Sequence, residues 1–165
     1  IAEALGVSVP AVKSLLQRAR GRLDELDLSG PPGTPDVALE RALLDRYIAA
    51  FEAADAAAIR AVIHDDFSLE SVPHPTWFQG VDVCLPFLER RVFAALGGTI
   101  RLRPTRSNGQ PAIASYRRDP TGDLRADGLW VLTIADGRIS RAIKFHAPGL
   151  VESAGLPTVL REGTT

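Results

Sequence analysis

The sequence predicts an α+β fold in which helices come first and an antiparallel sheet follows. Apolar residues recur at spacings of three and four through residues 39–51, which indicates a helix with one buried face. The second half contains short segments separated by marked turns, among them Asn108-Gly109 and Asp136-Gly137. Helices followed by a meander favour an α+β fold over a parallel sheet with alternating helices.

Two further helices are predicted ahead of the sheet. Asp55 suits the cap of a short helix that ends near Ile63, because its carboxylate can accept a hydrogen bond from the free amides of the first turn. The next helix is expected from Asp82 to about Leu96. It tolerates Pro86 only because this residue lies near the start of the helix.

The remaining apolar segments are predicted to be strands, over residues 67–72, 99–105, 112–118, 129–135 and 138–146. Between the first strand and the third helix lies the Pro-bounded segment His74–Gly80, which we expect to be a loop. Its Trp77-Phe78 pair is expected either to close the mouth of a cavity or to fill the core.

Composition restricts the class of protein. The chain has 165 residues, of which 45% are hydrophobic and 24% are charged, as in ordinary globular proteins. No segment is apolar enough to span a membrane. The single cysteine, Cys84, cannot form an intramolecular disulfide, so we expect a cytoplasmic protein in which Cys84 is a small buried residue. Methionine is absent and the chain starts at Ile1, so we expect a fragment of a longer protein.

Positive charge is concentrated at the start of the chain. Residues 1–23 carry four basic side chains against Glu3, hence +3, and the total of −1 leaves −4 for the other residues. Gly6 is expected to end one helix and Ser8 to cap another over Val9–Leu26. A helical wheel gives this second helix one apolar face and one polar, basic face.

A helix of this kind fits a DNA major groove, where Gln and Arg contact base edges and Lys neutralises phosphates. The candidate DNA-binding residues are Lys13, Ser14, Gln17, Arg18 and Arg20. The alternative is an ordinary amphipathic surface helix whose basic face is solvated.

The same segment resembles region 4 of extracytoplasmic-function (ECF) sigma factors of the sigma-70 family. The stretch IAEALGVSVPAVKSLLQRARGRL follows the family pattern Ile-Ala-x-x-Leu-Gly, then Ser-x-x-x-Val-Lys-Ser-x-Leu-x-Arg-Ala-Arg. By this resemblance, residues 1–26 are the end of a helix-turn-helix and residues 27–33 are a linker. The implied partners are core RNA polymerase and promoter DNA.

The sequence lacks the family's region 2 and the earlier helices of region 4. The chain alone is therefore expected to bind promoter DNA weakly and not to initiate transcription. We also expect its helix to expose Val12, Leu16 and Leu23, which would favour a homodimer of the fragment.

Residues 34–165 resemble the SnoaL-like extension that some of these sigma factors carry. The matching phrases are LLDRYIAAFEAADAAAIRAVIHDDFSLESVP, PTWFQG, SNGQPAIASYRR and GRISRAIKFHAPGLVESAGLP. The resemblance implies a cone of three helices on a curved, mostly antiparallel sheet, with a cavity between. It also implies regulation of transcription in cis, by contact of the domain or its tail with the sigma regions. Tail residues expected to be available for this contact are Leu150, Val151 and Leu156.

The fold also occurs in ketosteroid isomerases and polyketide cyclases, which leaves an enzyme as the alternative. Such chemistry needs a carboxylate base, for which Asp66 and Glu70 are the nearest candidates, but no spacing requires it and we assign no catalytic residue. A small apolar ligand would instead make the domain a sensor. The candidate pocket residues are Tyr47, Trp77, Phe78, Tyr116, Trp130 and His146. Tyr47 is expected in the core with its hydroxyl hydrogen-bonded.

No metal or cofactor is expected. The histidines, His64, His74 and His146, match no short metal-binding motif. The paired and neighbouring glycines are too isolated to form a phosphate-binding loop, and are typical of turns.

Overall fold

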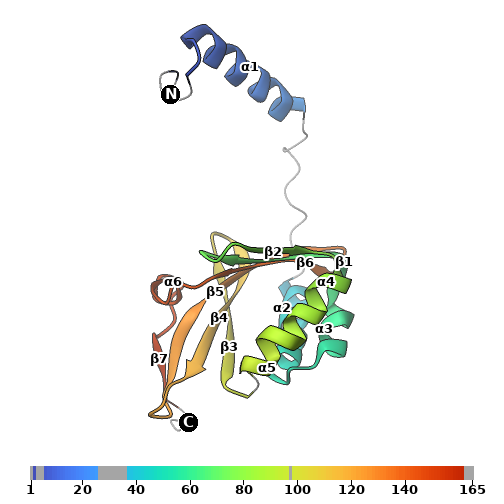
Figure 1. Ribbon diagram of the computed structural model, residues 1–165, viewed down its shortest axis with the longest axis vertical. Helices are drawn as coiled ribbons and strands as arrows, with labels where there is room; N and C mark the ends of the chain where they lie inside the picture. The colour runs from blue at the N-terminus through green and yellow to red at the C-terminus, as the bar shows by residue number, and fades with distance from the viewer. Residues whose placement is uncertain (1, 3–5, 26–36, 97, 162–165) are drawn as a thin grey trace. The chain divides into compact units, whose positions relative to one another are not determined.

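The computed structural model describes residues 2, 6–25, 37–96 and 98–161, with side chains from 23 to 25 left out. The chain separates into two compact units, residues 1–36 and residues 37–165. The first unit contains one described helix, α1 (Val9–Glu25) (Figure 1). Ser8 caps it as predicted, since its Oγ accepts a hydrogen bond from the Ala11 amide at 3.3 Å. The predicted linker, residues 27–33, lies outside the described residues.

The second unit begins with helices and continues as a sheet. Its elements are, in order, α2 (Val37–Glu52), α3 (Ala56–Val62), β1 (Ile63–Val72), β2 (Thr76–Gln79), α4 (Val81–Phe87), the π-helix η1 (Leu88–Phe93), α5 (Ala94–Leu96), β3 (Ile100–Ser107), β4 (Gln110–Arg118), β5 (Leu124–Ala135), β6 (Arg138–Phe145), α6 (Gly149–Ser153) and β7 (Val159–Leu160). None of the helices in the described part of the chain has the length and apolar character needed to cross a membrane.

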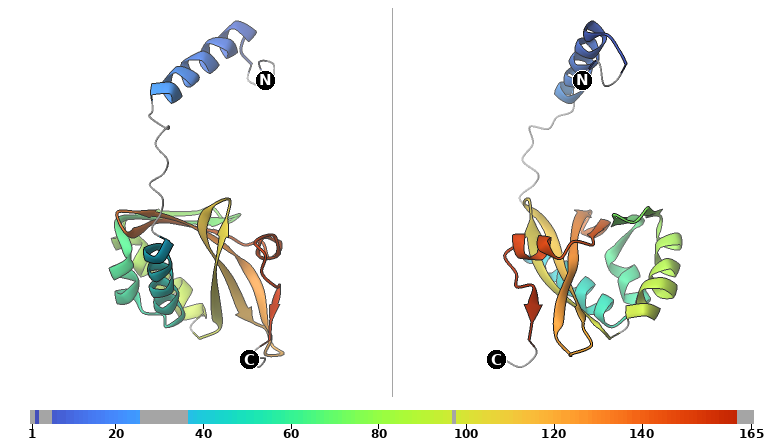
Figure 2. Two further views of the ribbon diagram at one scale, coloured as in Figure 1. Left: turned by 180° about the vertical axis from the view of Figure 1, so that it is seen from behind. Right: turned by 60° about the vertical axis from the view of Figure 1, so that its left-hand side comes forward.

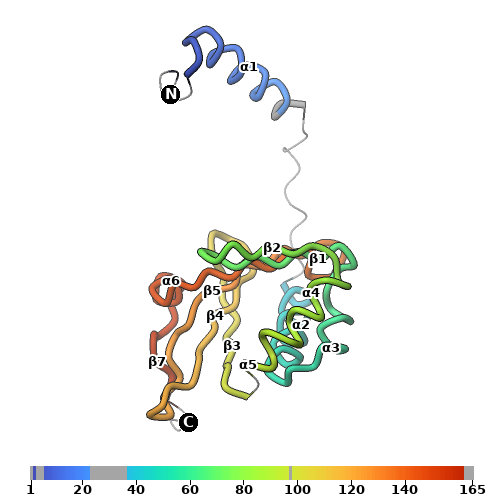
Figure 3. The backbone as a smooth tube through the Cα atoms, viewed as in Figure 1, coloured from blue at the N-terminus to red at the C-terminus, as the bar shows by residue number. Residues whose placement is uncertain are grey.

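The strands form one mixed sheet in the order β2-β1-β6-β5-β4-β3, and β7 pairs with β5. The β1–β6 pair is parallel, although these strands lie far apart in the sequence (Figure 3), whereas the other pairs are antiparallel. The sheet is strongly curved and does not close into a barrel (Figure 1). This arrangement confirms the predicted α+β class and the mostly antiparallel sheet.

Buried apolar residues form two clusters. They lie on opposite faces of the sheet, where Figure 2 shows the helices α2 to α5 on one side and α6 with β7 on the other. The first, which we call the helix-side core, joins α2, α3 and α4 to the sheet and contains Phe51 and Trp130. The second, which we call the tail-side core, lies under α6 and β7 and consists of Ala112, Ala114, Tyr116, Leu124, Leu129 and Val151. Both faces of the sheet are thus covered by the chain itself.

Three local predictions from the sequence are confirmed: a helix cap, a hairpin turn and a buried cysteine. Asp55 accepts a hydrogen bond from the Ala58 amide at 2.9 Å and so begins α3. Asn108 and Gly109 have φ values of 50° and 77°, the positive pair that a tight hairpin turn requires. Cys84 is fully buried, as expected.

The predicted loop at residues 74–80 is wrong in part, because it contains strand β2. Trp77 pairs with Glu70 of β1, and Phe78 pairs with Leu69. This segment is too short and too rich in proline for apolar and polar residues to alternate clearly. Its backbone hydrogen-bond partners come from the neighbouring strand β1.

The third helix is continuous over the predicted range but is not uniformly α-helical. Its middle, η1, is a π-helix, in which the Ala94 amide bonds to the Glu89 carbonyl five residues earlier. Pro86, just before it in α4, has no amide hydrogen to donate. The regular series of α-helical hydrogen bonds is therefore interrupted near the point where the π-helix begins.

The tail does not offer the apolar surface that the sequence suggested. Val151 is fully buried in the tail-side core, and Leu156 packs against the same cluster. Hydrogen bonds fasten the segment, since the Ala126 amide donates to the Thr158 carbonyl at 2.8 Å. Leu150 alone of the three predicted residues is exposed, at 37%. The expectation that Val151 and Leu156 are available to a partner is wrong, because they cover the outer face of their own sheet.

Candidate functional site

Helix α1 presents the candidate DNA-binding residues to solvent. Successive side chains turn by about 100° on a helix, so Ser14 and Gln17 lie on the polar face, with Lys13 and Arg20 along one edge of it and Arg18 along the other. All five are exposed in the structure. The helix has 17 residues and is therefore about 25 Å long. This surface is suited to contact a polyanion, because it carries cations and a hydrogen-bonding amide without apolar side chains.

The opposite face of α1 is apolar and uncovered. Leu15 and Leu16 are 52% and 50% exposed. Of the three residues predicted to be exposed on this face, Leu16 is exposed, Val12 is half-buried, and Leu23 has no described side chain. Amphipathic helices in soluble proteins normally bury such a stripe, so we expect other segments to pack on it when α1 functions.

The six predicted pocket residues are distributed over different parts of the second unit. Tyr47 and Trp130 lie in the helix-side core on either side of Phe51, with ring centroids 5.9 and 5.5 Å from the Phe51 ring. Tyr116 lies in the tail-side core, where its hydroxyl donates to the Pro157 carbonyl at 2.9 Å. Of these three residues, the structure brings only Tyr47 and Trp130 together, and Phe78 also packs against their cluster.

The other three predicted pocket residues lie at the β1–β2 hairpin or beside it. Trp77 is 60% exposed on β2. Phe78 is half-buried and packs on Phe87 of α4, with ring centroids 4.5 Å apart. His146 follows β6, where its Nε2 lies 2.8 Å from the Ser71 Oγ.

Neither candidate carboxylate base is both buried and unpaired. Glu70 pairs with Arg141 of β6 at 2.6 Å, and Asp66 is exposed. Burial, followed by the neighbouring positive charge of Lys144, holds the pKa of His146 below its usual value. His146 and His74 are in ring contact at 4.8 Å. The described residues contain no cluster of three or more side chains fit to hold a metal ion.

A buried polar cluster on the helix-side face was missed by the sequence analysis. Asp127 is the extra residue of a β-bulge in β5, since Ser115 pairs with Gly128 and Tyr116 with Ala126. The bulge directs the Asp127 carboxylate to the Lys144 ammonium, 2.5 Å away on β6. The Asp127-Gly128 pair lies just before the predicted strand at residues 129–135, which in the structure begins earlier, at Leu124, so the sequence did not place the bulge inside a strand.

Two buried donors in the helix-side core have no hydrogen-bond acceptor among the described residues. They are the Tyr47 hydroxyl and the Trp130 indole nitrogen. The expectation that the Tyr47 hydroxyl is hydrogen-bonded is therefore wrong, because no described residue accepts a hydrogen bond from it. Burial raises the pKa of Tyr47, with Cys84 as a smaller cause, so the hydroxyl keeps its proton.

The two buried tyrosines give a matched test of this difference. Tyr47→Phe should raise the free energy of unfolding by about 1 kcal/mol, because it removes a buried polar group that has no partner. Tyr116→Phe should lower it by about 1 kcal/mol, because the Pro157 carbonyl loses its donor. Urea denaturation measures both. Equal losses for the two variants would show that the Tyr47 hydroxyl does have a partner, such as a buried water.

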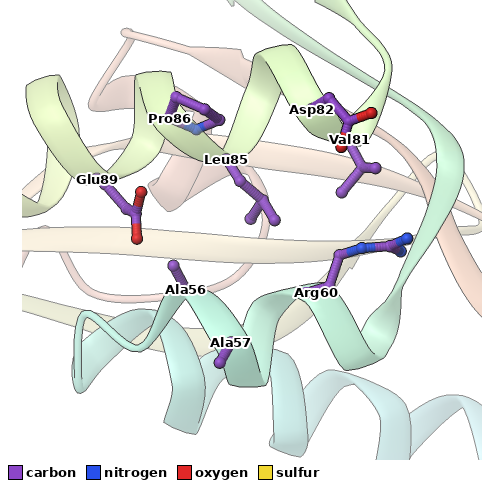
Figure 4. A pocket seen from close by; sticks show the side chains of 8 residues that line it. All are labelled: Ala56, Ala57, Arg60, Val81, Asp82, Leu85, Pro86 and Glu89. Atoms are coloured by element: carbon purple, nitrogen blue, oxygen red, sulfur yellow. The ribbon is translucent and has the colours of Figure 1, made fainter.

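A groove of about 400 Å³ lies between α3 and α4. Figure 4 shows Ala56 of α3 pointing toward the opposite helix, with Arg60 and Asp82 toward one end of the groove and Glu89 toward the other. Arg60 is already paired with Asp65 at 2.7 Å. None of the predicted site residues lines this groove.

Some known proteins are similar to the second unit alone, and others are similar over both units. The model of the SnoaL-like domain family matches residues 44–142, more than half of the chain. The chain belongs to the SnoaL-like family. Among solved structures, the SnoaL-like domain is similar to one described as a candidate SnoaL-like polyketide cyclase from Jannaschia, at 14% identity and a TM-score of 0.53, covering 76% of this chain and 96% of the other.

A second solved structure, described as a candidate ketosteroid isomerase from Kribbella flavida, matches at 20% identity and a TM-score of 0.51, over 67% of this chain and 78% of the other. At these identities the likeness concerns the fold alone. It confirms the predicted SnoaL-like architecture.

The similarity to a curated relative extends over both units. The chain is 36% identical over 163 residues to the ECF RNA polymerase sigma factor SigG of Mycobacterium tuberculosis. The match covers 97% of this chain and 44% of that protein, so the chain spans less than half the length of the relative. The resemblance to ECF sigma factors is thereby confirmed, and it includes α1 as well as the SnoaL-like domain.

Proposed function

We propose that the chain acts in the bacterial cytoplasm as part of an ECF-type RNA polymerase sigma factor. In this proposal α1 contacts promoter DNA and the SnoaL-like domain regulates transcription initiation in cis. The observation that carries it is the 36% identity to a sigma factor over 97% of the chain, continuous from the basic segment into the SnoaL-like domain. A relation through the SnoaL-like fold alone would not extend to α1.

The surface of α1 supports the DNA-binding part of the proposal. Its polar face is exposed and carries Lys13, Gln17 and Arg20, which are residue types that contact phosphates and base edges. The exposed apolar face, with Leu15 and Leu16, supports packing on other segments of a sigma factor. In the isolated chain the same face supports self-association of two copies.

Covalent linkage supports regulation in cis. Only residues 26–36 separate the end of α1 from the start of α2. A linkage this short keeps the local concentration of one unit near the other high, so a contact too weak to hold two separate proteins together can still act within one chain. Core RNA polymerase is the shared partner on which such a contact would act.

The enzyme alternative has less support in the described residues. Asp66 is exposed and Glu70 is paired with Arg141, so neither candidate is a buried carboxylate that is free to act as a base. The likeness to cyclases and isomerases concerns the fold and carries no reaction with it.

Promoter-specific transcription tests the proposal. The full-length sigma factor that contains this sequence is compared with a version ending before residue 37, in reactions with core RNA polymerase. We expect the full-length protein to direct transcription, and loss of the SnoaL-like domain to change the rate at least fivefold or so, the lower end of ordinary regulatory couplings. No transcription by the full-length protein would overturn the sigma-factor assignment. Equal rates would overturn regulation in cis.

A further inference from the structure

The groove between α3 and α4 combines an apolar lining with two acids. Apolar side chains from both helices line it, among them Leu85 of α4. Asp82 and Glu89 lie toward its opposite ends (Figure 4). Both acids are exposed, and no described residue forms an ion pair with either. Arg60 also lines the groove, but it is already paired with Asp65 at 2.7 Å. The groove therefore offers an apolar surface with two unpaired negative charges.

The two acids and the leucine share a regular spacing. Leu85 comes three residues after Asp82 and four before Glu89, so the three side chains lie on one helical face. All three line the groove. Seven residues separate the two acids in sequence, which corresponds to about 10 Å along a helix. This wall of the groove is complementary to a helix that carries two cations at the same interval around an apolar residue.

Helix α1 carries this complementary pattern. Leu16 comes three residues after Lys13 and four before Arg20, so two cations flank an apolar residue at the interval of the two acids. Leu16 is 50% exposed. The two cations lie along the edge of the apolar face next to it. Opposite charges meet whichever way the two helices run, because each end of the groove has an acid and each end of this edge has a cation.

The chain between the two units is long enough for α1 to meet the groove. Residues 26–36 can extend up to about 36 Å. One wall of the groove, α3, packs against α2, which has 16 residues and is about 24 Å long. Every part of α3 thus lies within reach of a segment that ends at α2. A short linkage gives a local concentration in the millimolar range, at which a weak contact is populated.

We propose that the groove between α3 and α4 binds α1 of the same chain. Leu16 packs against Leu85, while Lys13 and Arg20 pair with the acids at the two ends of the groove. These two cations are candidate DNA contacts, so α1 docked in this way is withheld from DNA. The inference rests on the proposed regulation in cis and gives it a direction, which is inhibition.

The mobility of α1 in the ¹⁵N-labelled 165-residue chain reports docking. In the unchanged chain the Gln17 amide should have an order parameter of about 0.85, relative to the tumbling of the SnoaL-like domain. The variant Lys13→Glu with Arg20→Glu should lower it below about 0.6, because α1 leaves the groove. The matched control, Arg18→Glu with Arg22→Glu, changes the net charge equally on the other side of α1 and should keep the higher value.

Reversing the acids as well tests the ion pairs directly. Adding Asp82→Lys and Glu89→Lys to the variant with reversed cations restores opposite charges and should return the Gln17 amide to about 0.85. The substituted side chains are exposed, so dispersed amide signals from the sheet should show that each variant is folded.

Binding to duplex DNA of unrelated sequence measures the consequence of docking. Asp82→Asn with Glu89→Gln should raise the affinity of the chain at least fivefold or so, because α1 is released from the groove. The matched control, Asp136→Asn with Glu152→Gln, removes two exposed carboxylates elsewhere in the SnoaL-like domain and should leave the affinity nearly unchanged.

The inference is overturned by any of three results. The first is an order parameter below about 0.6 for Gln17 in the unchanged chain. The second is a docked state that disappears on dilution, which would assign the groove to α1 of a second copy. The third is equal affinity of the two carboxylate variants for DNA. A mobile α1 in a sigma factor that still responds to loss of the SnoaL-like domain would overturn the groove contact and leave regulation in cis standing.

Discussion

Replacing Arg18 with alanine should lower transcription from the cognate promoter by about 10- to 100-fold in the full-length sigma factor, if α1 is its recognition helix. An arginine with bidentate contact to a base edge contributes about 1–3 kcal/mol of discrimination, which corresponds to that range. Arg18 is exposed, so its loss should leave the folding of the chain unchanged. The measurement is transcription from the cognate promoter and from a promoter with one altered base pair.

Variants at different positions of α1 should distinguish residues that contact bases from residues that neutralise phosphates. Lys13→Ala should weaken binding on all DNA sequences alike and should reduce the slope of log K against log salt by about 0.9. Arg41→Ala is the matched control, because Arg41 is an exposed helical arginine of the SnoaL-like domain, paired with Asp45 at 2.9 Å. Equal transcription by the Arg18 and Arg41 variants would contradict the assignment of α1 to DNA.

Gly128→Ala should be among the most destabilising single substitutions in the SnoaL-like domain. A Cβ at position 128 would lie 2.2 Å from the Phe145 carbonyl oxygen, which belongs to the backbone of β6 and cannot rotate away. The strands must separate at the bulge, and the Asp127–Lys144 pair that the bulge positions is disturbed with them. We expect a loss of about 3 kcal/mol or more in the free energy of unfolding.

Urea denaturation of the chain measures this loss as a lower midpoint. Gly149→Ala is the matched control, since a Cβ there meets nothing within 4 Å and φ is not positive. That variant should unfold at nearly the same urea concentration as the unchanged protein. A Gly128 variant as stable as the Gly149 variant would mean that β5 and β6 approach each other less closely than the structure has them.

Candidate site residues could be grouped from the sequence only where they lie on a single helix. The exposed face of α1 follows from helical spacing, so Lys13, Gln17 and Arg20 could be grouped from the sequence. The pocket list could not be assembled in this way. Tyr116 and Trp130 lie on neighbouring strands, β4 and β5, but on opposite faces of the sheet. The bulge at Asp127 shifts the register within β5, so alternation along the sequence no longer predicts which face a residue occupies.

The sequence by itself determined the elements whose causes are local: the cap of α1 at Ser8, the cap of α3 at Asp55 and the turn at Asn108-Gly109. It also determined the family, through motifs that stay contiguous. Tertiary structure alone decided that a Pro-rich loop becomes β2, that Val151 is buried, and that the Asp127–Lys144 pair exists. Each of these depends on a partner distant in the sequence, and the free energy of pairing or burial belongs to both partners rather than to either segment.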